Sequence, residues 1–282
     1  ADHAFRTNFQ RVVPAVANDA AIREAIRLIL RKWELTSTRF FPCLSGNADV
    51  SGATRRQFGE LGYTNVLNYS LDPSRRRFHT INTFGLEAIT NTAPRKTSPP
   101  QASVTYKVRE HTEGLGRIAL VEFEGALPRA KLFADWQEGV SDVEALEILA
   151  SAGFDPHQRV IFHETGLPEP DMPAGTISLG SVEFVANRTK YIELKTPPTD
   201  INAVLMLNDR HNPDWQVTVD GKPARLLRAN FLMRGVYLEP SKEGHTVIFR
   251  YLPPTQPLMV SSAAGLVGLI FGVIGLCRRK ED

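Results

Sequence analysis

The sequence has little cysteine, with Cys43 and Cys277 the only two in 282 residues. A small secreted scaffold held by disulfides needs several pairs, so the fold must depend on a packed core. The chain also lacks an excess of charge, since 33 Lys and Arg face 31 Asp and Glu. Nucleic-acid binding needs clustered basic residues, and the densest runs, Arg55-Arg56 and Arg75–Arg77, are short. We therefore expect no nucleic-acid partner.

Recognised catalytic motifs are absent as well. The chain has no GxSxG, HExxH, CxxC, Walker A or GxGxxG pattern. Its seven histidines are scattered without the spacing of metal ligands, so we assign no metal and no cofactor. Asp209 with Asp214, or Glu122 with Glu124, could act as paired acids on a glycoside, but turn chemistry and a solvated strand face explain them better. We assign no catalytic residue.

One long hydrophobic run lies near the C-terminus, at Leu258–Cys277. Its 20 residues include no charged, Asn or Gln side chain, and a helix of that length spans about 30 Å, the thickness of a bilayer core. A buried core helix is the alternative, but four glycines would weaken it in water. Because Arg278–Lys280 follow directly, the positive-inside rule predicts a cytoplasmic tail and an extracytoplasmic region over residues 1–257.

Small residues form a stripe along this predicted transmembrane helix. Gly265, Gly268, Gly272 and Gly275 recur every three or four residues, which is typical of a face that packs against another helix. A helix alone in membrane lipid is the alternative. An exported region needs a signal, and the chain begins at Ala1 with none. We therefore expect a fragment, with a signal or partner helices upstream or in another chain.

The first part of the chain, residues 1–170, predicts a mixed α+β region. Helical periodicity is clear at residues 20–32, and a capping box at Ser141 and Glu144 begins a second helix that ends at Gly153. Val143, Leu146, Ile148 and Leu149 should form its apolar face. Strands are expected at residues 35–41, 61–69, 78–84, 104–108, 117–123, 130–136 and 159–162, with an exposed loop at 90–102.

The next part, residues 171–254, predicts an all-β module. Strand-like runs recur about every ten residues, and Asp220-Gly221 is a strong hairpin signal between two of them. Such spacing indicates an antiparallel β-sandwich, jelly-roll-like in character. The fold class is thus α+β, with residues 255–282 forming the membrane helix and tail. The expected strands cover residues 176–186, 191–194, 203–208, 216–219, 224–228, 232–238 and 246–251.

An ordered series of short motifs carries a family resemblance over Ala203–Tyr251. The series reads Pro213-Asp214-Trp215, Asp220-Gly221-Lys222, Arg228-Ala229-Asn230, Gly244–Val247 and Tyr251-Leu252-Pro253. It resembles the C-terminal region of the bacterial YfhO-like membrane proteins, which are related to GT-C glycosyltransferases. Weaker likeness extends upstream to Trp33–Phe40, Ala126–Ala130 and Gly153–Pro156. Asp214 replaces the family's glycine, and Arg210 and His211 replace its aromatic residues, so a contact made by that turn is open to change.

The resemblance implies a function that the residues alone do not. It implies a non-catalytic extracytoplasmic module of a polytopic protein in the bacterial cell membrane. Such proteins resemble enzymes that move a sugar from an undecaprenyl-phosphate carrier to a cell-envelope polymer, so a lipid-linked sugar or that polymer is the implied partner. The family's acidic residue on its first extracytoplasmic loop has no counterpart here. Two alternatives stay open: a single-pass anchored binding or adhesion module with no enzymatic parent, and an anchored hydrolase using Asp209 or Asp214.

Candidate ligand-binding residues lie in the all-β part. Trp215 and Tyr237 have rings that can stack on a sugar, and Trp136 is a third such residue. Arg228 and Asn230 could reach the sugar's hydroxyl groups, and Asp214 lies in the turn before Trp215. The alternative is that these aromatic side chains belong to the core of the β-module.

Overall fold

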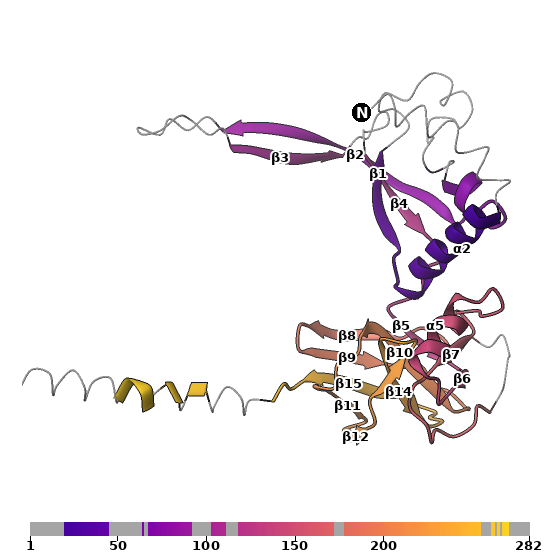
Figure 1. Ribbon diagram of the computed structural model, residues 1–282, viewed down its shortest axis with the longest axis vertical. Coiled ribbons are helices and arrows are strands. Elements are labelled where there is room, and N and C mark those ends of the chain that lie inside the picture. The colour runs from indigo at the N-terminus through magenta and orange to yellow at the C-terminus, as the bar shows by residue number, and fades with distance from the viewer. Residues whose placement is uncertain are drawn as a thin grey trace, which may run out of the picture. The chain divides into compact units, whose positions relative to one another are not determined.

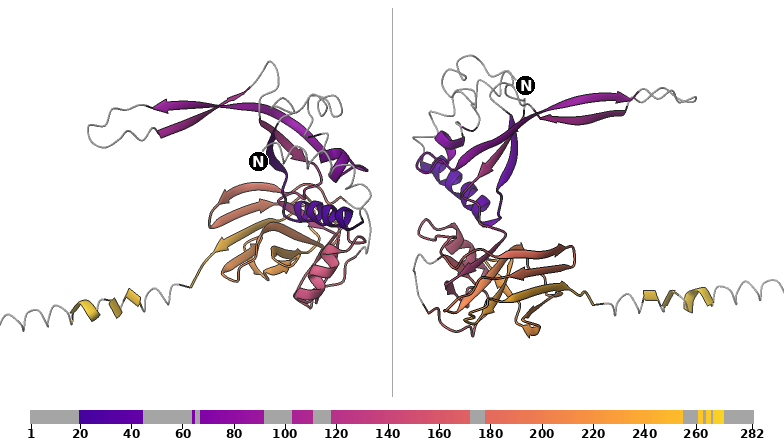
Figure 2. Two further views of the ribbon diagram at one scale, coloured as in Figure 1. Left: turned by 45° about the horizontal axis from the view of Figure 1, so that its top comes forward. Right: turned by 180° about the vertical axis from the view of Figure 1, so that it is seen from behind.

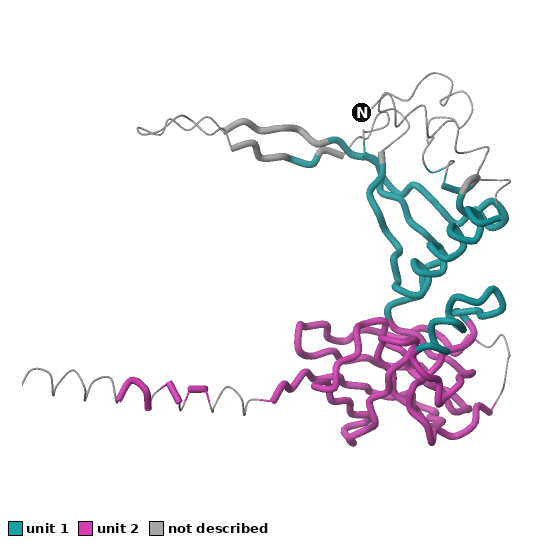
Figure 3. Tube along the Cα trace, viewed as in Figure 1, with its two compact units in different colours: residues 1–129, 143–157 teal, residues 130–142, 158–282 magenta. Residues whose placement is uncertain are grey.

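The computed structural model describes residues 20–44, 64, 67–91, 103–110, 118–171, 178–254, 261–262, 264–265 and 267–270. The chain divides into two compact units (Figure 3). The first comprises residues 1–129 and 143–157, and the second comprises residues 130–142 and 158–282. Both contain antiparallel sheets, and helices occur beside them, so the chain is α+β as expected (Figure 1).

The first unit has a four-stranded antiparallel sheet in the order β1-β4-β2-β3. Helix α2 packs on it through Leu30 and Trp33, which meet the buried rings of Phe78 and Phe123. Beyond Phe84, β2 leaves β4 and pairs only with β3, so the two form a ribbon past the rest of the sheet (Figure 2). The elements are α2 (Ala20–Leu35), β1 (Phe40–Leu44), β2 (Phe78–Asn91), β3 (Ser103–Glu110) and β4 (Ile118–Phe123).

Helix α2 runs three residues further than predicted, and the strand expected from Leu35 begins only at Phe40. The Thr36 hydroxyl donates to the carbonyl of Lys32 at 2.7 Å, and Ser37 then adopts a φ of 52°. A threonine that bonds back to the preceding turn closes the helix, although its β-branched side chain favours a strand in isolation. That local hydrogen bond decides the boundary.

The strand predicted at residues 61–69 is wrong for the residues of this range that the structure describes. Thr64 is helical, and Leu67–Leu71 form the π-helix η1. The amide of Asn68 accepts from the Phe78 N–H at 2.9 Å and donates to its carbonyl at 2.8 Å. Asn68 thus satisfies the first backbone groups of β2 in place of a neighbouring strand. Of the loop predicted at 90–102, residues 90 and 91 end β2, and the rest lies outside the described residues.

The predicted helix is confirmed as α5 (Asp142–Ala150), and its predicted apolar face is confirmed for Leu149 and Ile148 but wrong for Val143 and Leu146. Ala145 and Leu149 are buried, whereas Val143 and Leu146 are 68% and 52% exposed. A short helix that is apolar on most sides can bury either face, and tertiary contacts decide which. Here Arg31 and Arg27 of α2 donate to the carbonyls of Leu149 and Ala150, which fixes how the helix end lies.

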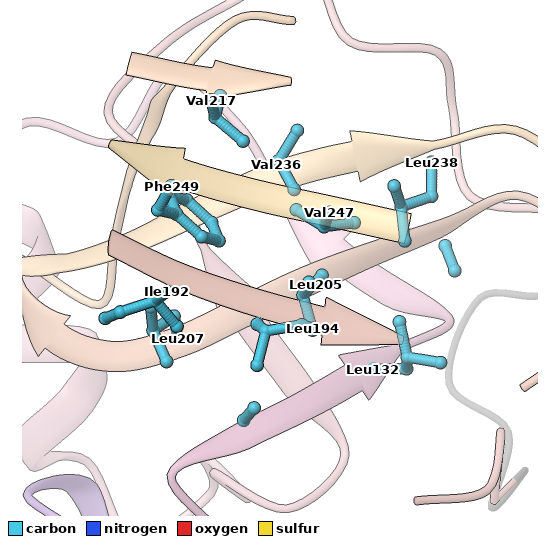
Figure 4. Packing of buried hydrophobic residues seen from close by; sticks show 12 residues of the cluster. Leu132, Ile192, Leu194, Leu205, Leu207, Val217, Val236, Leu238, Val247 and Phe249 are labelled. Carbon is cyan, nitrogen blue, oxygen red and sulfur yellow. The ribbon is translucent and has the colours of Figure 1, made fainter. Parts of the chain in front are cut away.

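The second unit is a β-sandwich. One sheet has the order β13-β14-β10-β5, and the other has the order β12-β11-β15-β9-β8. Figure 4 shows side chains of the two sheets, such as Leu205 and Phe249, meeting in one core. The strands are β5 (Ala130–Phe133), β8 (Glu183–Arg188), β9 (Tyr191–Lys195), β10 (Ala203–Arg210), β11 (Trp215–Val219), β12 (Lys222–Ala224), β13 (Leu227–Ala229), β14 (Met233–Leu238) and β15 (Thr246–Tyr251).

Three predicted strands of this unit differ in extent. Residues 130–136 divide between β5 and β6 (Asp135–Gln137), and β6 pairs in parallel with β7 (Arg159–Ile161). Residues 224–228 divide between β12 and β13, which belong to different sheets. The strand expected from residue 176 begins only at Glu183. The Asp220-Gly221 hairpin is confirmed, with φ values of 50° and 79°.

Most of the predicted transmembrane segment lies outside the described residues. Residues 261–262, 264–265 and 267–270 are helical, and Val267, Leu269 and Ile270 are at least half exposed. Within the described ranges, no helix has both the length and the apolar character needed to cross a bilayer. Among the described residues, no heavy atom beyond the chain neighbours and the helix's own backbone lies within 4 Å of a Cβ built at Gly265 or Gly268. Gly272 and Gly275 are not described, so the membrane helix and its packing stripe stay predictions.

Candidate functional site

A group of polar and aromatic side chains gathers at one end of the sandwich. We define the rim cluster as Asp209, Asp214, Trp215, Arg234 and Tyr251. It forms where β10 and β15 end and where β11 and β14 begin. Residues from both sheets therefore meet there. Asp214 and Trp215 were ligand-binding candidates from the sequence, and Asp209 was named with Asp214 in the hydrolase alternative.

Arg234 is the centre of the rim cluster and is only 3% exposed. Alternation along β14 places it on the face of Val236 and Leu238, which point into the core. Its guanidinium lies 3.9 Å from the ring centroid of Trp215 and donates to Asp209 Oδ2 at 2.9 Å. A buried charge is costly unless it is paired, and the carboxylate and the ring supply that pairing. Arg234 thus lies against the hydrophobic core, with its guanidinium 5.6 Å from the ring centroid of Phe249.

Asp209 reaches Arg234 because β10 is irregular there. The register with β14 shifts between Leu207 and Arg210, which forms a bulge. Bulges redirect side chains and are frequent beside functional sites. The Asp209 side chain is 23% exposed, so one of its sides faces Arg234 while solvent reaches the other.

The turn before β11 brings Asp214 and Trp215 to Tyr251. Asn212 Oδ1 accepts from the Asp214 N–H at 2.8 Å, and the Tyr251 hydroxyl donates to Asp214 Oδ2 at 3.3 Å. The rings of Trp215 and Tyr251 lie 5.3 Å apart. Burial raises the pKa of Tyr251, and the charge of Asp214 adds to that effect, so the phenol stays protonated. Asp214 therefore has a contact of its own in this turn.

A second polar group surrounds Arg228, which lies directly across from Arg234 in the register of β13 and β14. Glu164 accepts from the Arg228 backbone N–H at 2.8 Å, and Asp142 accepts from its guanidinium at 2.5 Å. Burial lowers the pKa of nearby His211, and Arg228 and Arg234 lower it further, while Glu164 opposes them. His211 is therefore uncharged near neutral pH.

Asn230 and Tyr237 lie elsewhere. Asn230 is 5% exposed, and its side-chain oxygen accepts from the Ile161 N–H at 3.1 Å. Tyr237 lies on the other face of β14 from Arg234, where its hydroxyl donates to Asn202 Oδ1 and its ring meets Trp136. The structure thus brings Asp214 and Trp215 together, places Arg228 beside Arg234, and leaves the other two candidates in separate contacts that order the sandwich.

The rim cluster has the chemistry to hold a hydroxylated ligand. Carboxylate oxygens at Asp209 and Asp214 can accept hydrogen bonds from hydroxyl groups, and the rings of Trp215 and Tyr251 offer apolar surface. One face of the Trp215 ring is covered by Arg234, so a sugar would meet its edge or its other face. Among the described side chains, no three His, Cys, Asp or Glu lie close enough to hold a metal ion.

The sequence contained a signal for Arg234 that the prediction missed. The strand expected at 232–238 alternates, and that alternation places Arg234 with Val236 and Leu238 on one face. A charged residue on the apolar face of a strand indicates a paired or functional charge. The partner, Asp209, could not be identified from sequence because the bulge that delivers it is a tertiary feature.

Comparison with known proteins gives little further guidance. No family model matches the chain, and no curated protein matches it. A cryo-EM structure of the arabinofuranosyltransferase AftD from mycobacteria is similar to 54% of this chain, with a TM-score of 0.25 and 13% identity. The match covers 9% of that protein. A similarity of this size assigns neither a fold nor an activity to the chain.

Proposed function

We propose that the chain is a non-catalytic extracytoplasmic module of a YfhO-like membrane glycosyltransferase, and that the rim cluster holds the carbohydrate acceptor. The motif series of the sequence motivates the kind of parent protein. A parent of that kind would move a sugar from an undecaprenyl-phosphate carrier to a cell-envelope polymer. The module would then serve the acceptor side of the reaction.

The observation that carries the proposal is the position of the rim cluster along the chain. The Leu252 N–H donates to the Asp214 carbonyl at 2.9 Å, so the cluster is bonded to the last residues before the predicted membrane helix. Fully extended, the chain from Leu252 to Leu258 spans about 20 Å at most. An acceptor held at the rim cluster would lie within that distance of the bilayer, where a lipid-linked donor presents its sugar.

Binding tests the acceptor role. We would place the full chain in lipid nanodiscs and titrate a panel of defined hexose and pentose oligosaccharides by calorimetry. Asp214→Ala should weaken binding about tenfold, because it removes a half-buried carboxylate acceptor and the hydrogen bond that orders Tyr251. Asp200→Ala, at an exposed aspartate outside the cluster, is the matched control and should have no effect. If Asp214→Ala and Asp200→Ala bound the oligosaccharide equally well, the rim cluster would not be the binding site.

A transfer assay tests the non-catalytic role. The full chain is incubated with an undecaprenyl-phosphate-linked sugar and the acceptor that binds best. Turnover by the chain alone would contradict the proposal. Binding without transfer by the complete reading frame would instead favour the anchored binding module with no enzymatic parent.

A further inference from the structure

The outer face of the five-stranded sheet carries an ordered row of polar side chains. Gln216, Arg250, Tyr191 and Arg188 lie opposite one another across β11, β15, β9 and β8. Their chain neighbours Val217, Phe249 and Ile192 are buried in the core, so alternation directs the row away from it. Gln216, Arg250 and Arg188 are exposed, and Tyr191 is partly exposed.

Contacts within the row hold two of these side chains in place. The Arg250 guanidinium lies 5.5 Å from the ring centroid of Tyr191. The Tyr191 hydroxyl donates to Glu193 Oε2 at 2.7 Å, and that hydrogen bond raises the pKa of Tyr191. An arginine stacked on an aromatic ring loses less freedom when it binds a ligand, because its fork of donors is already oriented.

Charge along the row favours an anionic ligand. Arg188 and Arg250 flank Tyr191 on either side, and two strand spacings put their positions about 10 Å apart. Glu193, in the adjacent row, is engaged by Tyr191. Arginine binds carboxylates through two parallel hydrogen bonds, and Gln216 offers both a donor and an acceptor for hydroxyl groups.

We propose that this row binds an acidic glycan, with Arg250 and Arg188 each holding a carboxylate and Gln216 and Tyr191 contacting sugar hydroxyls. The inference rests on the proposed carbohydrate-binding function and adds to it a ligand class and a second surface. It assigns to the outer sheet a role that none of the ligand-binding candidates named from the sequence carries.

The test compares three probes on the full chain in nanodiscs: trigalacturonate, neutral maltotriose and inorganic phosphate. Trigalacturonate should bind, and Arg250→Gln and Arg188→Gln should each weaken it about tenfold. Arg210→Gln, which removes an exposed arginine at the end of β10, is the matched control and should not change the affinity. Because all three positions are exposed, thermal unfolding of the variants should match that of the parent chain.

Three other results would overturn the inference. Maltotriose binding as tightly as trigalacturonate would show that charge does not select the ligand. If phosphate bound to the row as tightly as trigalacturonate, the row would be a general anion site that does not recognise a glycan. Binding that survives both row variants but is lost in Asp214→Ala would reject the row and retain the rim cluster. Loss of binding in the row variants, with no effect of Asp214→Ala, would instead support the row and remove the rim cluster from the binding site.

Discussion

Arg77 joins three parts of the first unit, and its removal should destabilise that unit strongly. Its guanidinium donates to Asp72 Oδ2 at 2.8 Å and to Glu34 Oε1 at 2.7 Å, and it lies 4.9 Å from the ring centroid of Phe123. The side chains of Asp72 and Glu34 are only 5% and 9% exposed. Burial alone would lower the pKa of Arg77, but its bonds to the two carboxylates outweigh this and raise it.

The expected magnitude follows from the charges that remain. Arg77→Met retains most of the packing on Phe123 and leaves two buried carboxylates. Removing one partner of a buried ion pair costs about 3–5 kcal/mol. Arg31 still pairs with Glu34 at 3.1 Å, so the lower end of that range applies, chiefly from Asp72. A loss of about 3 kcal/mol should lower the melting temperature of the unit by about 10 °C.

Hydrogen exchange over residues 20–35, combined with thermal unfolding of the full chain, measures this loss. Arg39→Met is the matched control. It removes the ion pair between Arg39 and Glu122, in which the Arg39 side chain is 60% exposed. Such a surface pair contributes about 1 kcal/mol or less. Adding Asp72→Asn to Arg77→Met should recover part of the loss, because it removes the unpaired charge. If Arg77→Met costs no more than Arg39→Met, the account of a buried charge network is wrong.

Two further predictions concern turns of the second unit. Gly244→Ala should destabilise the full chain by about 2–4 kcal/mol in urea unfolding, because its φ is 77° and a Cβ there would collide with the Thr196 carbonyl. Gly221→Ala, with a φ of 79° and open space around it, should cost only about 1 kcal/mol, and equal costs would refute the steric account. The pKa of Asp220 is lowered: burial opposes ionisation, but bonds from His245 and the Thr246 N–H outweigh it. The ionised carboxylate therefore stabilises the fold fully at pH values above the pKa of an unfolded Asp, which is about 4. This contribution is lost as the pH falls from there through the lower pKa of the folded state. The difference in melting temperature between the parent chain and Asp220→Asn should shrink between pH 5 and pH 2, and a constant difference would contradict the assignment.

The sequence predicted the features of this fold that depend on contacts between residues close in the chain, and it did not predict those that depend on contacts between distant residues. Strands with clear alternation, such as those at residues 191–194 and 246–251, form as predicted, and the Asp220-Gly221 turn connects β11 to β12. These features depend on local chemistry. The membership of the sheets did not follow, because alternation identifies a strand but not its partner. Thus β5, which lies far before the predicted all-β module in the sequence, pairs with β10 in the same sheet.

The same distinction applies to the candidate site. Trp215 was named for a ring that can stack on a sugar and Asp214 for its place in the turn before it, and the structure places both in the rim cluster. Asn230 was named for a side chain that could reach sugar hydroxyl groups, yet its amide instead bonds to the backbone of Ile161. A polar or aromatic side chain can order the fold as well as bind a ligand. Only the contacts of each side chain separate the two.

The position of β15 has a mechanical consequence. It lies between β11 and β9 and is antiparallel to both, and the chain leaves the sandwich directly from its end. A pull on the residues beyond Leu252 therefore acts along the strand and loads the hydrogen bonds of both neighbours in shear at the same time. Under such tension many hydrogen bonds would have to break at the same time. An edge strand pulled outward from its sheet would instead lose its hydrogen bonds one after another.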